Sequence, residues 1–532
     1  MTEHDFVIVG AGTAGAVVAR RLVDQGHSVL LLEAGGFARH PYLRIPVGFL
    51  PLLRSGYATW RYTTAPEPGL QGRVQAYSRG KVMGGSGAVN GLVHSWGQPV
   101  DFDHWAQLGC EGWSFDEVRP FFMKSESYPQ GDPATRGRSG PLAITGFSDP
   151  HPIARDFLGA AAEFGLPVLD DYNSEFGCGL ALVQQTRTGR VRATSATAYL
   201  RPLRPSPQFR LETDAHVLSI DLEGARAVGV QFRQGGQLRS ARARREVVLC
   251  AGAINSPHLL QLSGIGDAAQ LQPLGIEVKH HLPGVGDNLH DHFVAKVVRR
   301  IEGRTCLNEQ SKGLRLAWEV MKYVTAGKGI LTYSASSVTG HIKSDPGLEE
   351  PDLRVSFTPG SFPVSGGYEL DVQGGMTLGL WQMRPHSRGS VRAVSPDPLV
   401  APCISPGFLQ HPHDQRTAIA ALRLSRSFLF AKVFDGYGRQ ELLPGSGVDS
   451  DEALLDYARR TGVTMYHGAG SCRMGVDDGA VVDPRLRVRG VAGLRIADAS
   501  IMPRITSSNT HAPTVMIAEK AAEMIHRDAL DG

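Results

Sequence analysis

Two histidines near the end of the chain lie in loops that could form a catalytic site. His467 is in "TMYHGAGSCRMG" and His511 is in "SSNTHAPTVMIAEKAA", and glycine or proline interrupts both stretches. Histidine has an ordinary pKa near neutrality, so it suits a general base that removes a hydroxyl proton. A second histidine can hydrogen-bond the oxygen that loses its proton and fix its orientation. The two residues are therefore either unrelated or a pair that folding brings together, and the rest of the chain must decide.

The start of the chain has the pattern of a strand, a turn, a helix and a second strand. In "DFVIVGAGTAGAVVARRLVDQGHSVLLLEAGG" the spacing predicts a buried strand over 6–9, a helix over 14–23 and a second buried strand over 28–32. This order is typical of a nucleotide-binding parallel α/β sheet.

Three glycines between the first strand and the helix complete the motif G-x-G-x-x-G. Gly10, Gly12 and Gly15 allow a tight turn, a close approach of the backbone to a pyrophosphate, and packing of the helix on the strand. The helix amino terminus offers N–H groups to phosphates, and Glu33 is placed to accept a hydrogen bond from a ribose hydroxyl. We find no second unit of this kind, so the sequence predicts one bound dinucleotide, which the motif alone identifies as neither NAD nor FAD.

Composition excludes several classes of function. A net charge of +3 over 532 residues, without a run of Lys or Arg, gives no basis for nucleic-acid binding. No apolar stretch is long enough for a transmembrane segment, and the amino terminus has no signal-peptide pattern. Six scattered cysteines without a C-x-x-C pair indicate reduced thiols, so we predict a cytoplasmic protein and leave peripheral membrane attachment open. The stretch "HDH" at 290–292 lacks further ligands at suitable spacing, so we predict no metal site.

Four motifs in a fixed order give the chain a family resemblance. The fingerprint is followed by "YSRGKVMGGSGAVNGLVHSWGQPVDFDHW" (77–105), "GAINSPHLLQLSGIG" (252–266) and "LRIADASIMPRITSSNTHAPTVMIAEKAAEMI" at the end. Together they resemble the glucose–methanol–choline (GMC) oxidoreductase family, in its branch of bacterial choline and alcohol dehydrogenases, over essentially the whole chain. These are FAD-dependent enzymes that oxidise alcohols.

The resemblance implies roles for particular residues. His467 would be the catalytic base and His511 would fill the second position of the catalytic pair, in front of the flavin. Val217 would lie against the adenine. The resemblance, with the fingerprint, places these further residues at the cofactor: Thr13, Ala14, Ala34, Gly84, Gly85, Val89, Asn90, Gly91, Ala251, Asp498, Ala499, Thr510 and Met516. Four other histidines are expected to be structural or at the surface: His94, His216, His290 and His292.

Two departures from the family pattern narrow the chemistry. Some members attach FAD covalently through a histidine where this chain has Val89, so we predict non-covalent FAD. Choline-oxidising members carry a glutamate for the quaternary ammonium, and the comparable position here is Ser337. Without that carboxylate a trimethylammonium group loses its counter-charge, so choline is not expected as the substrate.

The predicted fold class is α/β, with a Rossmann-like FAD-binding domain interleaved with an α+β substrate domain built on an antiparallel sheet. The FAD-binding domain is assigned to 1–150, 191–300 and 464–532, and the substrate-binding domain to 151–190 and 301–463. Aromatic residues of the second domain could line the substrate pocket or belong to its core.

The favoured function is FAD-dependent oxidation of a primary alcohol to an aldehyde, with His467 as the base and hydride transfer to the flavin. "YHGAGSCRMG" is more similar to bacterial dehydrogenases than to oxidases. The partners expected are a small-molecule alcohol and an electron acceptor, which is a quinone, a cytochrome or oxygen. Two alternatives stay open: an alcohol oxidase that produces hydrogen peroxide, and a flavin-containing hydroxynitrile lyase on the same fold. A serine hydrolase is excluded because "GGSGA" lacks the second glycine of G-x-S-x-G.

Overall fold

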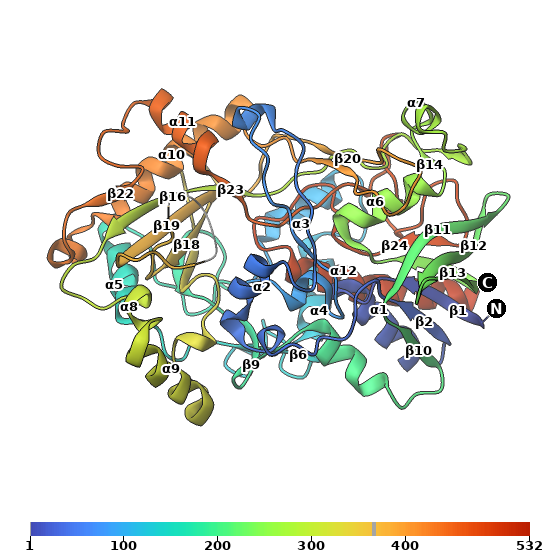
Figure 1. Ribbon diagram of the computed structural model, residues 1–532, viewed down its shortest axis with the longest axis horizontal. Coiled ribbons are helices and arrows are strands. Elements are labelled where there is room, and N and C mark those ends of the chain that lie inside the picture. Colours follow the sequence, from blue (N-terminus) through green and yellow to red (C-terminus); the bar gives the residue numbers. More distant parts are fainter. Residues whose placement is uncertain (1, 364–368, 532) are drawn as a thin grey trace.

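The structure is a computed structural model that describes residues 2–363 and 369–531, and it contains two large β-sheets set side by side (Figure 1). The first sheet has the strand order β10-β2-β1-β13-β12-β11, with β24 paired to β13. Strands β10, β2, β1, β13 and β24 are parallel, and β12 and β11 are antiparallel additions. Its strands are β1 (Thr2–Val9), β2 (Val29–Leu32), β10 (Phe209–Glu212), β11 (Ala215–Glu223), β12 (Arg226–Gln234), β13 (Gln237–Leu249) and β24 (Leu494–Ile496).

The second sheet is antiparallel and has the order β22-β16-β19-β18-β17-β7, with β23 paired to β16. Helix α10 (Pro412–Leu429) packs against β16 and β19. The expected α/β class, with a Rossmann-like part and an antiparallel part, is confirmed. The strands of the second sheet are β7 (Gly179–Leu182), β16 (Phe293–Arg300), β17 (Val338–Ile342), β18 (Leu353–Thr358), β19 (Gly375–Gln382), β22 (Glu441–Leu443) and β23 (Val463–Thr464).

Strand pairing places one domain boundary differently from the sequence. The first domain was predicted to run to residue 300, yet β16 pairs with β19, β22 and β23 in the second sheet. The change from one sheet to the other therefore lies ahead of Phe293. The reason is that β16 is buried on both faces, so its residues alone do not assign it to either sheet, whereas the predicted boundary followed the flavin motifs. The division into two domains otherwise stays a proposal.

The two ends of the chain meet in the first domain (Figure 1). Helix α12 (His511–Asp531) packs against α1 (Thr13–Asp24), and Arg21 forms two hydrogen bonds, of 2.7 and 2.8 Å, to the buried carboxylate of Glu519. This packing sets the start of α12 beside the glycine-rich turn that precedes α1. Within the described ranges, no helix is long and apolar enough to cross a bilayer.

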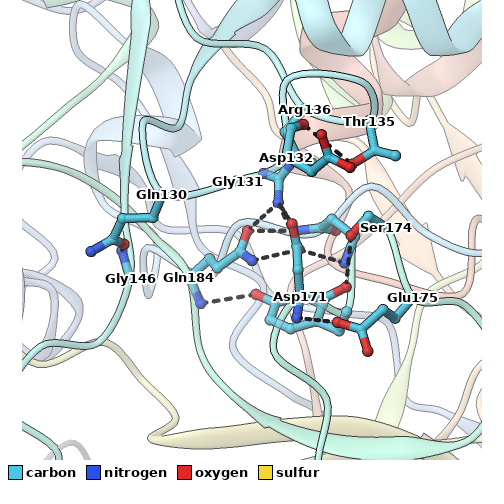
Figure 2. Close-up of polar contacts among 12 residues, drawn as sticks. Gln130, Gly131, Asp132, Thr135, Arg136, Gly146, Asp171, Ser174, Glu175 and Gln184 are labelled. Atoms are coloured by element: carbon cyan, nitrogen blue, oxygen red, sulfur yellow. Dashed lines mark hydrogen bonds and ion pairs between the residues drawn. The ribbon is translucent and has the colours of Figure 1, made fainter.

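A buried polar network joins three segments near the glycine-rich loop. The guanidinium of Arg136 donates to both carboxylate oxygens of Asp171 and to Gln184 (Figure 2), and to the carboxylate of Glu126 at 2.8 and 2.9 Å. Burial alone would raise the pKa of Glu126, but His94, 2.8 Å away, and Arg136 lower it to about 2. The network fixes the segment that continues from the glycine-rich loop at His94.

Candidate active site

A cavity of about 620 Å³ lies between the two sheets. Its walls come from the carboxyl ends of β1 and β2, from the glycine-rich loop at 84–91, and from β16, β18 and β19 of the second sheet. The carboxyl edge of a parallel sheet is where α/β proteins bind nucleotides. The cavity can thus hold a dinucleotide at one end and a smaller molecule against the second sheet.

The turn after β1 lies close to its neighbours and leaves helix α1 uncapped. Gly10 has φ +99°, and a Cβ atom there would come within 2.6 Å of the carbonyl oxygen of Cys250. Gly12 is the residue before the first turn of α1, and no side chain caps that turn. The free N–H groups at the start of α1 therefore face the cavity and suit a phosphate group.

Glu33 closes this turn from the second strand. Its carboxylate accepts hydrogen bonds from the N–H groups of Ala11 at 2.9 Å and Gly35 at 2.8 Å. Burial raises the pKa of Glu33 to about 7, although these bonds oppose the shift. Each carboxylate oxygen keeps a second lone pair, so Glu33, which lines the cavity, can also accept from a hydroxyl.

Most of the predicted cofactor residues line this cavity. Gly15, Gly84 and Met516 do not. Gly15 allows α1 to pack closely on the preceding turn, since a Cβ there would lie 1.9 Å from the oxygen of Gly10. Met516, on the core-facing side of α12, is fully buried. The predicted residues in the wall are Gly10, Gly12, Thr13, Ala14, Glu33, Ala34, Gly85, Val89, Asn90, Gly91, Val217, Ala251, Asp498, Ala499 and Thr510.

Asp498 ties two loops together at the cavity wall. Its carboxylate accepts from the N–H of Gly252 at 2.8 Å and from the hydroxyl of Ser256 at 2.6 Å, both in helix α6 (Gly252–Leu262). A carboxylate at the amino end of a helix is stabilised by the helix dipole. Asp498 thereby holds the α6 amino terminus against the loop that follows β24.

His467 and His511 both line the cavity, which answers the question that the two loops raise. The ring nitrogens of His511 are buried and have no hydrogen-bond partner among the described residues. A Cβ atom at Gly87 would lie 3.0 Å from Nε2 of His511 and from Oγ1 of Thr13, so the ring lies beside the glycine-rich loop. Burial lowers the pKa of His511 to about 3 and keeps it neutral. A buried imidazole without a partner is suited to hydrogen-bond a ligand.

A chain of hydrogen bonds fixes which nitrogen of His467 is free to accept a proton. Nε2 of His292 lies 2.8 Å from the carbonyl oxygen of Met383, and a carbonyl only accepts, so Nε2 carries the hydrogen. Burial lowers the pKa of His292 to about 3, so its Nδ1 is unprotonated and accepts from Nδ1 of His467 at 2.9 Å. The lone pair of His467 is therefore on Nε2, where the side-chain amide of Asn509 donates to it at 2.8 Å.

The backbone of His467 is held by a buried carboxylate. Asp291 accepts from the N–H of His467 at 2.7 Å, from the hydroxyl of Tyr77 at 2.8 Å and from the hydroxyl of Thr464. Burial raises the pKa of Asp291 to about 6 despite these bonds. Asp291 and His292 thus position the loop and the ring of His467 respectively.

His292 was expected to be structural or at the surface, and that expectation missed its contact with His467. Local sequence shows only "HDH", and the pairing depends on β16 and the loop at 464–467 lying side by side. A signal was present nonetheless, because His292 has the same parity as Val294 in the alternating strand that follows. His290 does have a structural role: it donates to the carbonyl of Asn288 and accepts from the N–H of Ile505.

Two comparisons of sequence identify relatives over the whole chain. The family described as GMC oxidoreductase matches residues 4–294 and 385–518. The chain is 36% identical over 529 residues to the alcohol dehydrogenase (acceptor) of Pseudomonas putida, covering 98% of this chain and 96% of that protein. It is 38% identical over 531 residues to the oxygen-dependent choline dehydrogenase of Chromohalobacter salexigens, covering 98% and 95%.

Solved structures show the same fold. The pyridoxine 4-oxidase of Mesorbium loti matches with a TM-score of 0.88 and 30% identity, over 98% of this chain and 99% of that one. A FAD-dependent oxidoreductase of Chaetomium thermophilum matches with a TM-score of 0.90 and 25% identity, over 99% and 100%. The resemblance found in the motifs is thus confirmed, and the chain belongs to the GMC oxidoreductase family.

Proposed function

We propose that this protein is a FAD-dependent alcohol dehydrogenase that oxidises a primary alcohol to the aldehyde, with His467 as the general base. The observation that carries the proposal is the hydrogen-bond chain that leaves the lone pair of His467 on Nε2, in the wall of a cavity with a dinucleotide end. The names of the relatives favour oxidation over the lyase alternative.

The dinucleotide end fits FAD in three respects. The uncapped start of α1 suits the pyrophosphate, Glu33 suits a ribose hydroxyl, and the unpartnered ring of His511 lies beside the glycine-rich loop. Val89 lines the cavity and has no nucleophilic atom, which supports non-covalent attachment at this position.

His467 takes the hydroxyl proton of the substrate. Burial, together with His292 and the nearby Arg79 and Arg354, lowers the pKa of His467 well below its ordinary value, so the ring is neutral at neutral pH. The incoming hydroxyl takes the place of the Asn509 amide at Nε2 and transfers its proton there as the carbon loses hydride. FAD, when bound, supplies the acceptor for that hydride. Loss of one proton to His467 and of one hydride to FAD converts the alcohol to an aldehyde, so no oxidant other than FAD is needed at this step.

The other groups orient the alcohol oxygen. His511, neutral and without a hydrogen-bond partner among the described residues, can donate one N–H to the oxygen as negative charge develops on it. His292 keeps the ring of His467 from rotating, because rotation would break the hydrogen bond between their Nδ1 atoms in a buried site.

The acceptor of the electrons is proposed to be a quinone or a cytochrome rather than oxygen. Support comes from the Pseudomonas putida relative, which is named an alcohol dehydrogenase (acceptor). The Chromohalobacter salexigens relative is named oxygen-dependent and the pyridoxine 4-oxidase is an oxidase, so oxygen is the alternative acceptor that the test below separates. Cytoplasmic location and any peripheral attachment to a membrane stay predictions from the sequence.

The test is the visible absorption spectrum of the purified holoenzyme under anaerobic conditions, before and after addition of primary alcohols. We expect an oxidised flavin spectrum that bleaches with at least one alcohol and recovers slowly in air but rapidly with a soluble quinone. Rapid recovery in air would make the protein an oxidase. Absence of flavin after reconstitution with FAD would refute the proposal.

The attachment of FAD is tested separately by acid precipitation of the holoenzyme. Non-covalent FAD leaves a yellow supernatant and a colourless pellet. A yellow pellet would contradict the proposal at Val89 and direct attention to other nucleophiles of the cavity wall, such as His216.

A further inference from the structure

The second sheet carries a lysine that lies in the cavity without a partner. Lys296 is in the middle of β16 and lines the cavity. Among the described residues, no carboxylate pairs with its ammonium group. Nζ lies over the ring of Phe362, 5.3 Å from its centroid. Desolvation by burial lowers the pKa of Lys296 below its ordinary value, and no nearby acid opposes that shift. A charged group held in this way is costly unless a ligand pairs with it.

The parity of β16 sets Lys296 on the same face as the residue that holds the catalytic base. Val294, Lys296 and Val298 alternate along one face of the strand and line the cavity, and His292, of the same parity, immediately precedes the strand. His292 contacts His467, and Lys296 lies four residues further on, about 13 Å along the strand at about 3.3 Å per residue. The amine is therefore separated from the reacting end by the length of a small molecule.

The neighbouring strands bring a hydroxyl to the same part of the cavity as this lysine. Lys296 pairs with Gly379 of β19, which pairs with Ser356 of β18, and paired residues of antiparallel strands point to the same face. Gly379 has no side chain, and a Cβ atom there would come within 2.7 Å of Val294. The space over Gly379 is therefore filled by the side chain of Val294, and Lys296, Gly379 and Ser356 all line the same part of the cavity.

The charges of the cavity wall favour a negative ligand at this end. Of the acidic residues that line the described wall, Glu33 and Asp498 are both at the dinucleotide end and already accept backbone N–H groups. The second-sheet end instead has Lys296, while Arg79 donates to the carbonyl of Tyr466. A trimethylammonium group would meet repulsion here and no counter-charge. Ser337, expected at the position of the choline-binding acid, is buried and outside the wall.

Resting on the function proposed above, we propose that the substrate is a hydroxy acid: a primary alcohol whose far end is a carboxylate held by Lys296 and Ser356. The chemistry at the hydroxyl end is unchanged, and the carboxylate takes no part in it. A single ammonium with one hydroxyl suits a carboxylate monoanion, whereas phosphate dianions are usually bound by several cations or by a helix amino terminus. Val294, which lies between the two ends and lines the cavity, suits contact with a methylene chain.

The experiment compares pairs of substrates of equal length with the reconstituted holoenzyme: 6-hydroxyhexanoate with 1-hexanol, and 10-hydroxydecanoate with 1-decanol. Rates of anaerobic flavin reduction give kcat/KM without dependence on the acceptor. We expect at least one hydroxy acid to exceed its alkanol by roughly 10- to 100-fold, the range of a charge-assisted hydrogen bond. In Lys296→Met the ratio of the hydroxy-acid rate to the alkanol rate should fall towards one with FAD content retained, and Lys296→Arg should keep the preference.

Binding without turnover supplies a second measurement. Hexanoate and decanoate lack the hydroxyl, so they should inhibit alkanol oxidation competitively, with inhibition weakened roughly 10- to 100-fold in Lys296→Met. Lys328→Met, the same change at an exposed lysine, is the matched control and should behave as the wild type.

The outcomes separate this proposal from the function on which it rests. If alkanols reduce the flavin and hydroxy acids do no better, the carboxylate site is refuted while alcohol oxidation stands. If Lys296→Met slows both classes equally or loses FAD, the lysine serves another purpose and the proposal is also refuted. If neither class reduces the flavin, the function as well as the substrate class is wrong.

Discussion

Nδ1 of His292 lies 2.9 Å from Nδ1 of His467, and both rings are buried beside Trp381. Two like nitrogens at this distance require one donor and one acceptor. The carbonyl of Met383 can only accept, so His292 donates to it through Nε2. Nδ1 of His292 is therefore the acceptor and Nδ1 of His467 the donor. The backbone carbonyl of Met383, which follows β19, thereby determines through His292 which nitrogen of His467 carries the hydrogen.

Replacing the base tests its role directly. His467→Ala removes the proton acceptor, so the rate of flavin reduction by alcohol should fall by roughly 10²- to 10⁴-fold. Stopped-flow absorbance with saturating substrate measures this rate. FAD content should be unchanged, because the dinucleotide end of the cavity keeps all its contacts. A variant that retains the wild-type rate would remove His467 from the mechanism.

Replacing its partner tests positioning. His292→Phe keeps an aromatic ring beside Trp381 but cannot accept from Nδ1 of His467. We expect kcat/KM to fall roughly 10- to 100-fold, as for loss of a hydrogen bond worth about 1–3 kcal/mol in a buried site. His292→Asn offers both an acceptor and a donor and should recover part of the loss. Equal loss in both variants would indicate a packing role instead.

The pH dependence follows from the ionisation of His467. In the proposed mechanism the neutral ring is the active form, and burial holds the pKa of His467 well below its ordinary value. The kcat/KM for an uncharged alcohol should therefore be constant from about pH 6.5 to about pH 8 and fall only as pH drops through the lowered pKa. The measurement needs excess FAD, because Glu33 has a pKa of about 7 and its protonation would weaken the dinucleotide end. A midpoint near 6.5 would mean that burial does not act on the base as described.

The buried network around Arg136 should make a large contribution to stability. Arg136→Met leaves two buried carboxylates, Glu126 and Asp171, without their cation, which costs roughly 3–5 kcal/mol of unfolding free energy. Urea unfolding followed by circular dichroism measures the loss. Arg416→Met, the same change at an exposed arginine of α10, should alter stability by less than about 0.5 kcal/mol.

The contribution of the same network to stability should be lost at acid pH. The pKa of Glu126 falls from 4.5 to about 2 on folding, so its contribution is complete above pH 4.5 and is lost as pH falls from there towards 2. The amount is roughly 3 kcal/mol by linkage. Wild type should lose stability over this interval more steeply than Arg136→Met, and parallel curves would contradict the assignment.

The sequence predicted the dinucleotide end of the cavity better than the substrate end. The fingerprint is local: a strand, three glycines and a helix within one short segment determine each other, so Gly10, Gly12 and Glu33 were identifiable without tertiary contacts. The prediction of His467 and His511 as catalytic residues came from motif order rather than from local physics, and both line the cavity. Gly15 and Met516 belong to these motifs but do not line the cavity, because membership of a motif does not tell whether a residue faces the ligand or the core.

The substrate end depends on pairings between distant segments. Asp291 supports His467 across a large separation in sequence, and Lys296 faces the cavity only because β16 joins the second sheet rather than the first. In "FVAKVVRR" Lys296 shares its parity with Val294 and Val298, but the strand is buried on both faces, so the parity does not single out the lysine. Without the sheet assignment, that parity could not be given a direction.

The regular spacing of side chains along β16 also sets the length of substrate that the cavity would prefer. Its register is fixed by continuous pairing from Val294↔Trp381 to Arg300↔Gly375, so a side chain moved by two residues moves about 6.6 Å and keeps its face. Exchanging Lys296 and Val298 should therefore leave the hydroxyl end untouched and shift the preference to longer hydroxy acids, while exchange with Val294 should favour shorter ones. Chain-length selection in this enzyme would then be adjustable in discrete steps set by the backbone repeat.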